Sequence, residues 1–91
     1  MFWVYILENP DGRFYVGQTD DLPRRVARHN DPTRDKTHYT AKHGPWELVY
    51  SEPHATRSDA MQRERFIKSR KSSAWMRKHL LGRAGPDAGR D

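Results

Sequence analysis

The sequence predicts a small α/β (α+β) domain in which helices flank a three-stranded, mainly antiparallel sheet, in the order β-β-α-β-α-α. Three observations lead to this fold class. An apolar, aromatic run opens the chain, a segment of strong turn chemistry follows it, and helix-capping residues precede the later helical patterns. The 91 residues are enough for one domain near the small end of the range.

The first two strands are predicted to form a hairpin. Residues 2–7 are rich in aromatic and β-branched side chains, which favours a strand buried on both faces. The turn Asn9-Pro10-Asp11-Gly12 combines a fixed proline φ with a glycine that accepts a positive φ. Residues 13–19 then form the antiparallel partner. In a hairpin centred on this turn, Tyr5 and Tyr15 are expected roughly opposite each other.

A helix is predicted next, with Asp20 or Asp21 as its N-cap and an end near Asn30. Pro23 fits the first turn of this helix, where its missing N–H costs nothing. Residues 30–45 are polar and rich in turn formers, so a long loop is expected there, of the kind that is more often functional than inert.

A third strand and a longer helix follow. Residues 46–51 alternate between apolar and polar side chains, which indicates a strand. Thr56 begins a segment that resembles a capping box, with Asp in place of the usual Glu or Gln. This cap predicts a helix over residues 57–71.

The last predicted helix is capped by Ser72 or Ser73 and runs through Leu81. Residues 82–91 are rich in Gly, Pro and charge and have no apolar periodicity, so they are predicted to be disordered. The folded domain is therefore expected to span residues 1–81.

Cysteine and membrane signals are both missing from the sequence. The chain has no cysteine, which excludes disulfides and thiolate metal sites and is compatible with a reducing compartment. No segment reaches the ~20 consecutive apolar residues of a membrane helix, and the apolar N-terminal run is too short for a signal peptide. We therefore expect a soluble cytoplasmic protein with no membrane partner.

The net charge of +5 is concentrated in one part of the chain. Residues 57–81 contain eight Lys and Arg against two Asp and Glu, whereas residues 1–56 contain seven against eight. A basic segment of this kind is typical of a surface that binds a polyanion, although a solvated helical face has the same composition.

Glu64 is the most unusual residue of this basic segment. On a helical wheel it lies close to Ala60 and within about 60° of Ile67, at the edge of the apolar stripe. A carboxylate in that position is costly unless a cation or an arginine pairs with it. An ordinary salt bridge at the helix border is the simpler interpretation, and a bound metal ion is the functional one.

Other candidate residues precede it. Tyr5 and Tyr15 have hydroxyls that can reach one place, although strand tyrosines are usually core residues. Gly17 indicates a bulge or a close approach by another group. Arg25 and His29 are four residues apart on one helix face, where an arginine can bind phosphate or remain solvated. No HExxH or H-x3-H spacing, Walker loop, GxGxxG or G-x-S-x-G motif occurs.

Together these residues resemble the GIY-YIG endonuclease superfamily, in particular short proteins similar to the N-terminal nuclease domain of the excinuclease C subunit. The family pattern has GIY on one strand, YIG on the next, then a helical arginine and a later helical glutamate. The corresponding residues here are Trp3-Val4-Tyr5, Tyr15-Val16-Gly17, Arg25 and Glu64. The resemblance covers residues 2–81.

The resemblance implies hydrolysis of DNA phosphodiester bonds with one Mg²⁺ or Mn²⁺, for which Glu64 is the only protein ligand. Arg25 is expected to stabilise the charge of the transition state, and Tyr5 and Tyr15 to contact the attacking water or the phosphate. Either a tyrosine or His29 is the general base, and the sequence leaves that choice open.

The expected partner is a nucleic acid, with DNA favoured over RNA. The residues expected to contact it are Gly17, Gln18, Lys42, Arg63 and Lys68. Three features depart from the family pattern: Trp3 replaces the glycine of GIY, Gln18 stands where several nucleases have lysine, and no clear match is found for the asparagine that excinuclease C subunits carry beyond the glutamate. The alternative function is therefore a non-catalytic nucleic-acid-binding module with the same fold. A third is a protein-interaction domain for acidic partners.

Overall fold

The computed structural model describes residues 1–31, 43–70 and 72–82 of the chain. Its elements are β1 (Phe2–Glu8), β2 (Phe14–Thr19), α1 (Leu22–His29), β3 (Glu47–His54), α3 (Arg57–Ser69) and α4 (Ser73–His79). The predicted order β-β-α-β-α-α is confirmed. Most of the predicted loop 30–45, which includes Lys42, and most of the predicted tail 82–91 lie outside the described residues.

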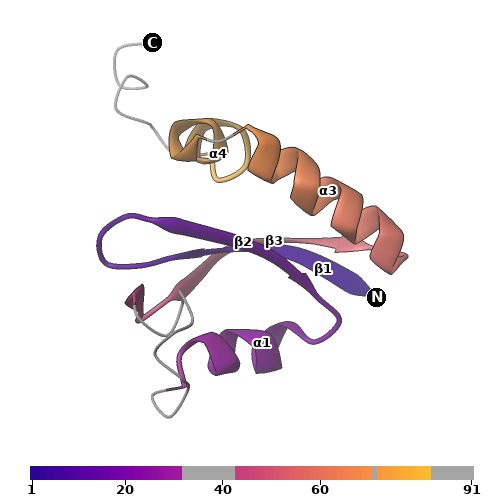
Figure 1. Ribbon diagram of the computed structural model, residues 1–91, viewed down its shortest axis with the longest axis horizontal. Coiled ribbons are helices and arrows are strands. Elements are labelled where there is room, and N and C mark those ends of the chain that lie inside the picture. The colour runs from indigo at the N-terminus through magenta and orange to yellow at the C-terminus, as the bar shows by residue number, and fades with distance from the viewer. Residues whose placement is uncertain (32–42, 71, 83–91) are drawn as a thin grey trace.

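The sheet is a three-stranded antiparallel sheet in the order β2-β1-β3, with β1 in the centre. Figure 1 shows α1 on one face of the sheet and α3 and α4 on the other. The side chains of a strand alternate between faces, so each face of β1 meets a different helical layer. This three-layer arrangement explains why Val4 to Leu7 all have an exposed fraction of 0%, as predicted for a strand buried on both faces.

The two faces of β1 build two separate clusters of core residues. On the face under α3 and α4, Val4 and Ile6 pack with a group of buried side chains that comprises Val16, Ala60, Ile67 and Met76. On the face under α1, Tyr5 and Leu7 pack with Trp46 and with partly buried side chains that comprise Tyr15, Leu22 and Val26. Tyr5 is therefore a core residue and a candidate site residue at once.

The register of the hairpin corrects one prediction. The turn is centred where the sequence indicated, but Tyr5 pairs with Gly17 and Leu7 pairs with Tyr15. The two tyrosines are thus diagonal neighbours on one face, because a hairpin of this register offsets them by two residues. Their ring centroids are 6.4 Å apart.

Strand β3 runs to His54, three residues beyond the predicted end. The predicted strand ended at Ser51, and Pro53 beyond it lacks the N–H that a ladder requires. Since β3 is an edge strand, a proline there can leave its missing donor on the open side. The predicted helices were also one or two residues too long at their C-terminal ends, where helices fray.

Helix caps fix the connections between the layers. The side chains of Asp21, Thr56 and Ser72 each accept a hydrogen bond from the backbone N–H three residues on, which confirms all three predicted N-caps. After α1, the Asn30 side chain donates to the Trp46 carbonyl oxygen at 2.8 Å and accepts from the Trp46 N–H at 2.6 Å. This pair of bonds holds the end of α1 beside the start of β3. None of the helices in the described ranges is long and apolar enough to span a bilayer.

Candidate active site

Tyr5 is the centre of the candidate site. Its side chain is completely buried, and its hydroxyl lies 2.9 Å from Nε2 of His29, which is itself 5% exposed. The Tyr15 ring stacks obliquely against the same imidazole, with centroids 4.8 Å apart. Strands β1 and β2 and helix α1 therefore bring together the two tyrosines and the histidine that the sequence singled out.

Burial raises the pKa of Tyr5 to about 12, from an ordinary value of 10.0. The neighbouring Tyr15 and, more weakly, the Glu64 carboxylate push this pKa further up, whereas the Arg25 guanidinium lowers it by its charge and by hydrogen bonding. The Tyr5 hydroxyl therefore lies within electrostatic reach of both Arg25 and Glu64. It is protonated at neutral pH.

Position 17 requires a glycine because the Tyr5 ring lies directly against its backbone. A Cβ atom at Gly17 would lie 2.6 Å from Oη and 2.7 Å from Cζ of Tyr5, closer than any ordinary contact. The glycine therefore allows the phenol to lie across the backbone of β2. This close approach by another group is what the lone glycine indicated in the sequence. Because β2 is an edge strand, the phenol is thereby directed toward the edge of the sheet.

Arg25 lies in a hollow between α1 and the end of β2. The hollow has a volume of about 240 Å³ and is lined by Thr19, Asp20, Asp21, Arg24, Arg25 and Arg28. Three of the six lining residues are arginines from one helix. Such a group of guanidinium donors suits the oxygen atoms of a phosphate.

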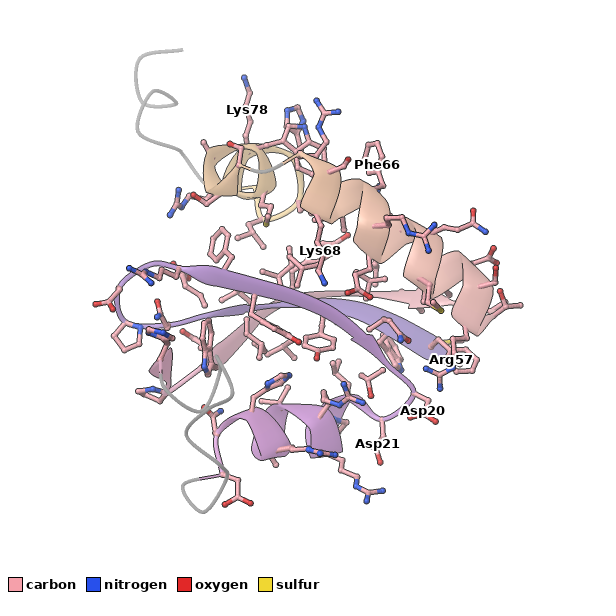
Figure 2. The ribbon with its side chains drawn as sticks, in the orientation of Figure 1. Asp20, Asp21, Arg57, Phe66, Lys68 and Lys78 are labelled. Atoms are coloured by element: carbon pink, nitrogen blue, oxygen red, sulfur yellow. The ribbon has the colours of Figure 1, made fainter. Side chains whose placement is uncertain are left out.

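Glu64 lies in a second hollow, of about 260 Å³, under α3. Gln18, Met61, Glu64, Arg65 and Lys68 line it, and Glu64 is the only acid among these described residues. The Glu64 side chain is 20% exposed and forms an ion pair of 2.6 Å with Lys68. Lys68 itself is 53% exposed, and Figure 2 shows its side chain extending from α3 toward the sheet.

The two hollows lie on opposite sides of the edge strand β2. Gln18 lines one and its neighbour Thr19 lines the other, and successive strand residues point to opposite faces. A phosphodiester passing along this edge would meet the arginines of α1 on one side and Glu64 of α3 on the other. The Tyr5 phenol lies across Gly17, the residue of β2 that precedes Gln18, and it lines neither hollow.

The donor set of the site fits a hard divalent cation with a single protein ligand. Glu64 offers carboxylate oxygens in an open hollow that water can enter. Among residues 1–31, 43–70 and 72–82, no three His, Asp or Glu side chains are grouped as a metal site. A cation at Glu64 would thus be completed by water and phosphate oxygens, which is the ligation that Mg²⁺ favours.

Only some of the other residues predicted to bind nucleic acid lie at the two hollows. Gln18 and Lys68 line the hollow of Glu64. Arg63 lies apart from both hollows and is ion-paired with Glu52 of β3 at 3.0 Å. Lys42 is outside the described residues. The roles predicted for these side chains stay predictions.

Two lining residues were missed by sequence reasoning. Met61 and Arg65 share the flank of α3 that holds Glu64 and Lys68. The signal that could have found them is helical spacing, because Met61 is three residues before Glu64 and Arg65 is three residues before Lys68, and residues three apart are neighbours on a helix surface. Asn30, which joins α1 to β3, gave no signal, because its partners are backbone atoms 16 residues away.

Comparisons with known proteins identify relatives of this chain. The family model described as GIY-YIG catalytic domain matches residues 1–79. A UPF0213 protein of Halobacterium salinarum is 43% identical over 68 residues, which cover 75% of this chain and 86% of that protein. A UPF0213 protein of Staphylococcus epidermidis is 42% identical over 67 residues, which cover 74% and 79% of the two chains.

A solved structure is similar over almost the whole chain. The solution NMR structure of the UPF0213 protein BH0048 from Bacillus halodurans aligns with a TM-score of 0.51 at 31% sequence identity. The alignment covers 99% of this chain and 94% of that one.

Proposed function

This chain belongs to the GIY-YIG family, a nuclease superfamily, and from that premise we propose that it is an Mg²⁺- or Mn²⁺-dependent endonuclease that nicks DNA. One observation supports this more than any other. Arg25 of α1 and Glu64 of α3 line two hollows that meet consecutive residues of the edge strand β2, Thr19 and Gln18. Side chains of α1 and α3 thus flank one edge of the sheet, along which a phosphodiester could pass.

Glu64 is the proposed metal-holding residue. A divalent cation bound there would polarise a phosphate oxygen and neutralise part of its negative charge. Binding requires that Lys68 leave the carboxylate, and its exposed side chain can move into solvent or onto a neighbouring phosphate.

Arg25 is proposed to stabilise the charge that develops on the phosphate in the transition state. Its guanidinium can donate two parallel hydrogen bonds to phosphate oxygens, which a lysine cannot. Arg24 and Arg28 line the same hollow and raise the local positive potential. Removal of one preorganised donor of this kind costs on the order of 10²–10³ in rate.

The bond between Tyr5 and His29 provides a route for the proton of the attacking water. Burial raises the pKa of Tyr5 to about 12, so the phenol is protonated at neutral pH and cannot accept a proton unless it gives up its own. In the tautomer whose proton is on Nδ1, Nε2 of His29 accepts from the phenol. Because Tyr5 is completely buried, a water molecule reaches Oη only when the site opens locally; a water proton would then pass to Oη while the phenol proton passes to Nε2, with His29 as the final acceptor.

A non-catalytic nucleic-acid-binding module is the second candidate function. The observation that favours it is the ion pair of 2.6 Å between Glu64 and Lys68, in which the lysine takes the place of a metal ion. Gln18 also lines this hollow where several family members have lysine. In this alternative the hollow binds phosphate through Lys68 and Arg65 and catalyses nothing.

The deciding experiment is a nicking assay on supercoiled plasmid and on structured DNA, with Mg²⁺, with Mn²⁺ and with EDTA. Wild type is compared with Glu64→Ala and Arg25→Ala. Asp59→Asn is the matched control for the acid, because Asp59 is exposed on the same helix and lines neither hollow. Arg13→Ala, an exposed arginine of the hairpin, is the control for the guanidinium.

The endonuclease proposal expects cleavage by wild type and by both controls only when metal is present, and none by Glu64→Ala. Absence of metal-dependent cleavage by wild type, together with DNA binding that survives both site substitutions, would instead establish the binding module. Titration with Mn²⁺ adds an independent readout. Removing the competing amine in Lys68→Ala should tighten Mn²⁺ binding if Glu64 is the ligand.

A further inference from the structure

Phe66 is an exposed aromatic residue on the side of α3 that faces away from Glu64. Its exposed fraction is 45%, and it is not part of either core cluster. Two residues along a helix differ by about 200°, so Phe66 and Glu64 occupy opposite flanks. Figure 2 shows Phe66 pointing away from the sheet. A single exposed phenylalanine is common in proteins and by itself indicates nothing.

The surroundings of Phe66 are more unusual, because aromatic rings and guanidinium groups alternate there. Phe66 meets Trp75 of α4 edge to face, with centroids 5.9 Å apart, and Trp75 lies 5.0 Å from the His79 ring. Arg70 lies over Phe66 at 5.8 Å and over Trp75 at 5.5 Å. We define these four residues, with Arg63 over Phe66 at 5.5 Å, as the aromatic–arginine face.

Packing of α4 against α3 does not account for this face. The buried contact between the helices and the sheet is made by Ile67 and Met76, which are 0% and 8% exposed. Trp75 also packs against that core with part of its surface. Phe66, Arg70 and His79 add little to the core, since all three are exposed.

The positive charge around the aromatic–arginine face indicates a negatively charged partner. Residues 57–81, which include the whole face, carry eight Lys and Arg against two Asp and Glu. A surface that combines flat rings, guanidinium planes and positive charge matches a strand of phosphates with free bases, because bases stack on rings and phosphates pair with arginine. An apolar protein partner would not need the cations, and duplex DNA would keep its bases out of reach.

We propose that the aromatic–arginine face binds single-stranded DNA by stacking an unpaired base on Phe66, while Arg70 and Lys78 hold the flanking phosphates. The choice of DNA rests on the proposed nuclease function, whereas the stacking chemistry does not. Figure 2 places Lys78 on the same outer side of the helical layer as Phe66.

The face and the hollow of Glu64 can serve one strand. They lie on the two flanks of α3, so a strand that joins them crosses a helix with a diameter of about 10–12 Å. At ~3.4 Å per stacked nucleotide, that path takes on the order of four nucleotides. Arg65 lines the hollow and is exposed on the intervening side of the helix. The proposed substrate is therefore DNA with an unpaired segment next to the bond that is cut.

The test measures binding of the full chain in EDTA, so that cleavage plays no part. The probe is a fluorescein-labelled oligothymidine of about 15 nucleotides, within the ~4–16 nucleotides that single-strand sites cover. An abasic strand of the same length has the same phosphates and no bases, and a duplex has bases that are already stacked. Anisotropy gives the dissociation constant of each probe for each variant.

The decisive variants are Phe66→Ala and Phe66→Leu. Stacking of one base contributes ~1–3 kcal/mol, so both substitutions should weaken oligothymidine binding at least about fivefold and leave the abasic strand unaffected. Phe66→Leu keeps an apolar side chain beside Trp75 and decides the question if Phe66→Ala fails to fold. Arg70→Lys keeps the charge but not the guanidinium plane, and should cause a smaller loss.

Leu48→Ala is the matched control, because Leu48 is a similarly exposed apolar residue, 38% accessible, on β3. Its affinity for oligothymidine should equal that of wild type. Three results would overturn the proposal: equal binding of the abasic and the base-bearing strand, wild-type affinity in Phe66→Leu, or self-association through Phe66 without any effect on DNA. None of these depends on whether the chain cuts DNA, so the two proposals can fail separately.

Discussion

Substitution of Gly17 by alanine tests the contact on which the position of the Tyr5 hydroxyl depends. The new Cβ would lie 2.6 Å from Oη and 2.7 Å from Cζ. An ordinary contact between carbon atoms is ~3.5–4.0 Å, so one of the two side chains must move by about 1 Å. Tyr5 has no free space to move into, because it is completely buried and bonded to His29.

The expected cost follows from these numbers. Overpacking of a core costs ~1–3 kcal/mol, and alanine recovers ~0.5–1 kcal/mol because glycine weakens a strand. Gly17→Ala should therefore lower the free energy of unfolding by about 1–2 kcal/mol. If the hydroxyl is displaced by about 1 Å, nicking should fall on the order of 10²-fold as well. Urea denaturation and the plasmid assay measure the two effects.

A double-mutant cycle isolates the clash. Tyr5→Leu removes the Cε, Cζ and Oη atoms that the new Cβ would meet, while it keeps an apolar residue at the site. In that background Gly17→Ala should cost nothing or stabilise slightly, which gives a coupling free energy of ~1–3 kcal/mol. An equal cost of Gly17→Ala in both backgrounds, or no cost in wild type, would refute the steric argument.

Three further predictions concern single side chains. Glu64→Gln should abolish nicking but change the free energy of unfolding by less than about 0.5 kcal/mol in urea, because an i,i+4 pair with the exposed Lys68 contributes little. A large loss of stability would instead indicate a structural salt bridge. Since the pKa of Tyr5 is raised from 10.0 to about 12, the unfolded chain releases this proton first as the pH rises. The free energy of unfolding should then fall between those two pH values by up to ~1.4 kcal/mol per pH unit, and Tyr5→Phe should remove that part of the slope in urea titrations. Asn30→Ala deletes both bonds to the Trp46 backbone and should cost about 1–3 kcal/mol by thermal unfolding, whereas Asn30→Asp, which keeps the acceptor, should cost less.

Local chemistry made most of the fold predictable from the sequence. The turn at residues 9–12 and the caps at Asp21, Thr56 and Ser72 each specify a connection through neighbouring residues alone. The end of β3 was harder, because the effect of Pro53 depends on whether its strand is at an edge of the sheet. That information lies in the pairing with β1 and not in the local sequence.

The candidate site was predictable to the extent that it follows the family pattern. Tyr5, Arg25 and Glu64 were identified through that pattern, and the structure puts Arg25 and Glu64 in hollows beside β2 and the Tyr5 ring across Gly17 of the same strand. The pairing of Tyr5 with Gly17 follows from a hairpin centred on Asp11, so the sequence contained this register, and placing the two tyrosines roughly opposite each other was two residues off. Lys68 was likewise not predicted as the partner of Glu64, because a basic helix offers the carboxylate several possible partners.

Helix α1 buries fewer side chains against the sheet than α3 and α4 do, and this affects the order in which the site unfolds. Helix α1 fully buries only His29 among its described side chains, with Leu22 and Val26 partly covered. The opposite layer buries Ala60, Ile67 and Met76 against the sheet. Amide hydrogen exchange should therefore find α1 opening at lower free energy than β1 or α3. Each such opening withdraws Arg25 while the sheet stays intact, so the chain should lose phosphate binding at denaturant concentrations that leave its strands paired.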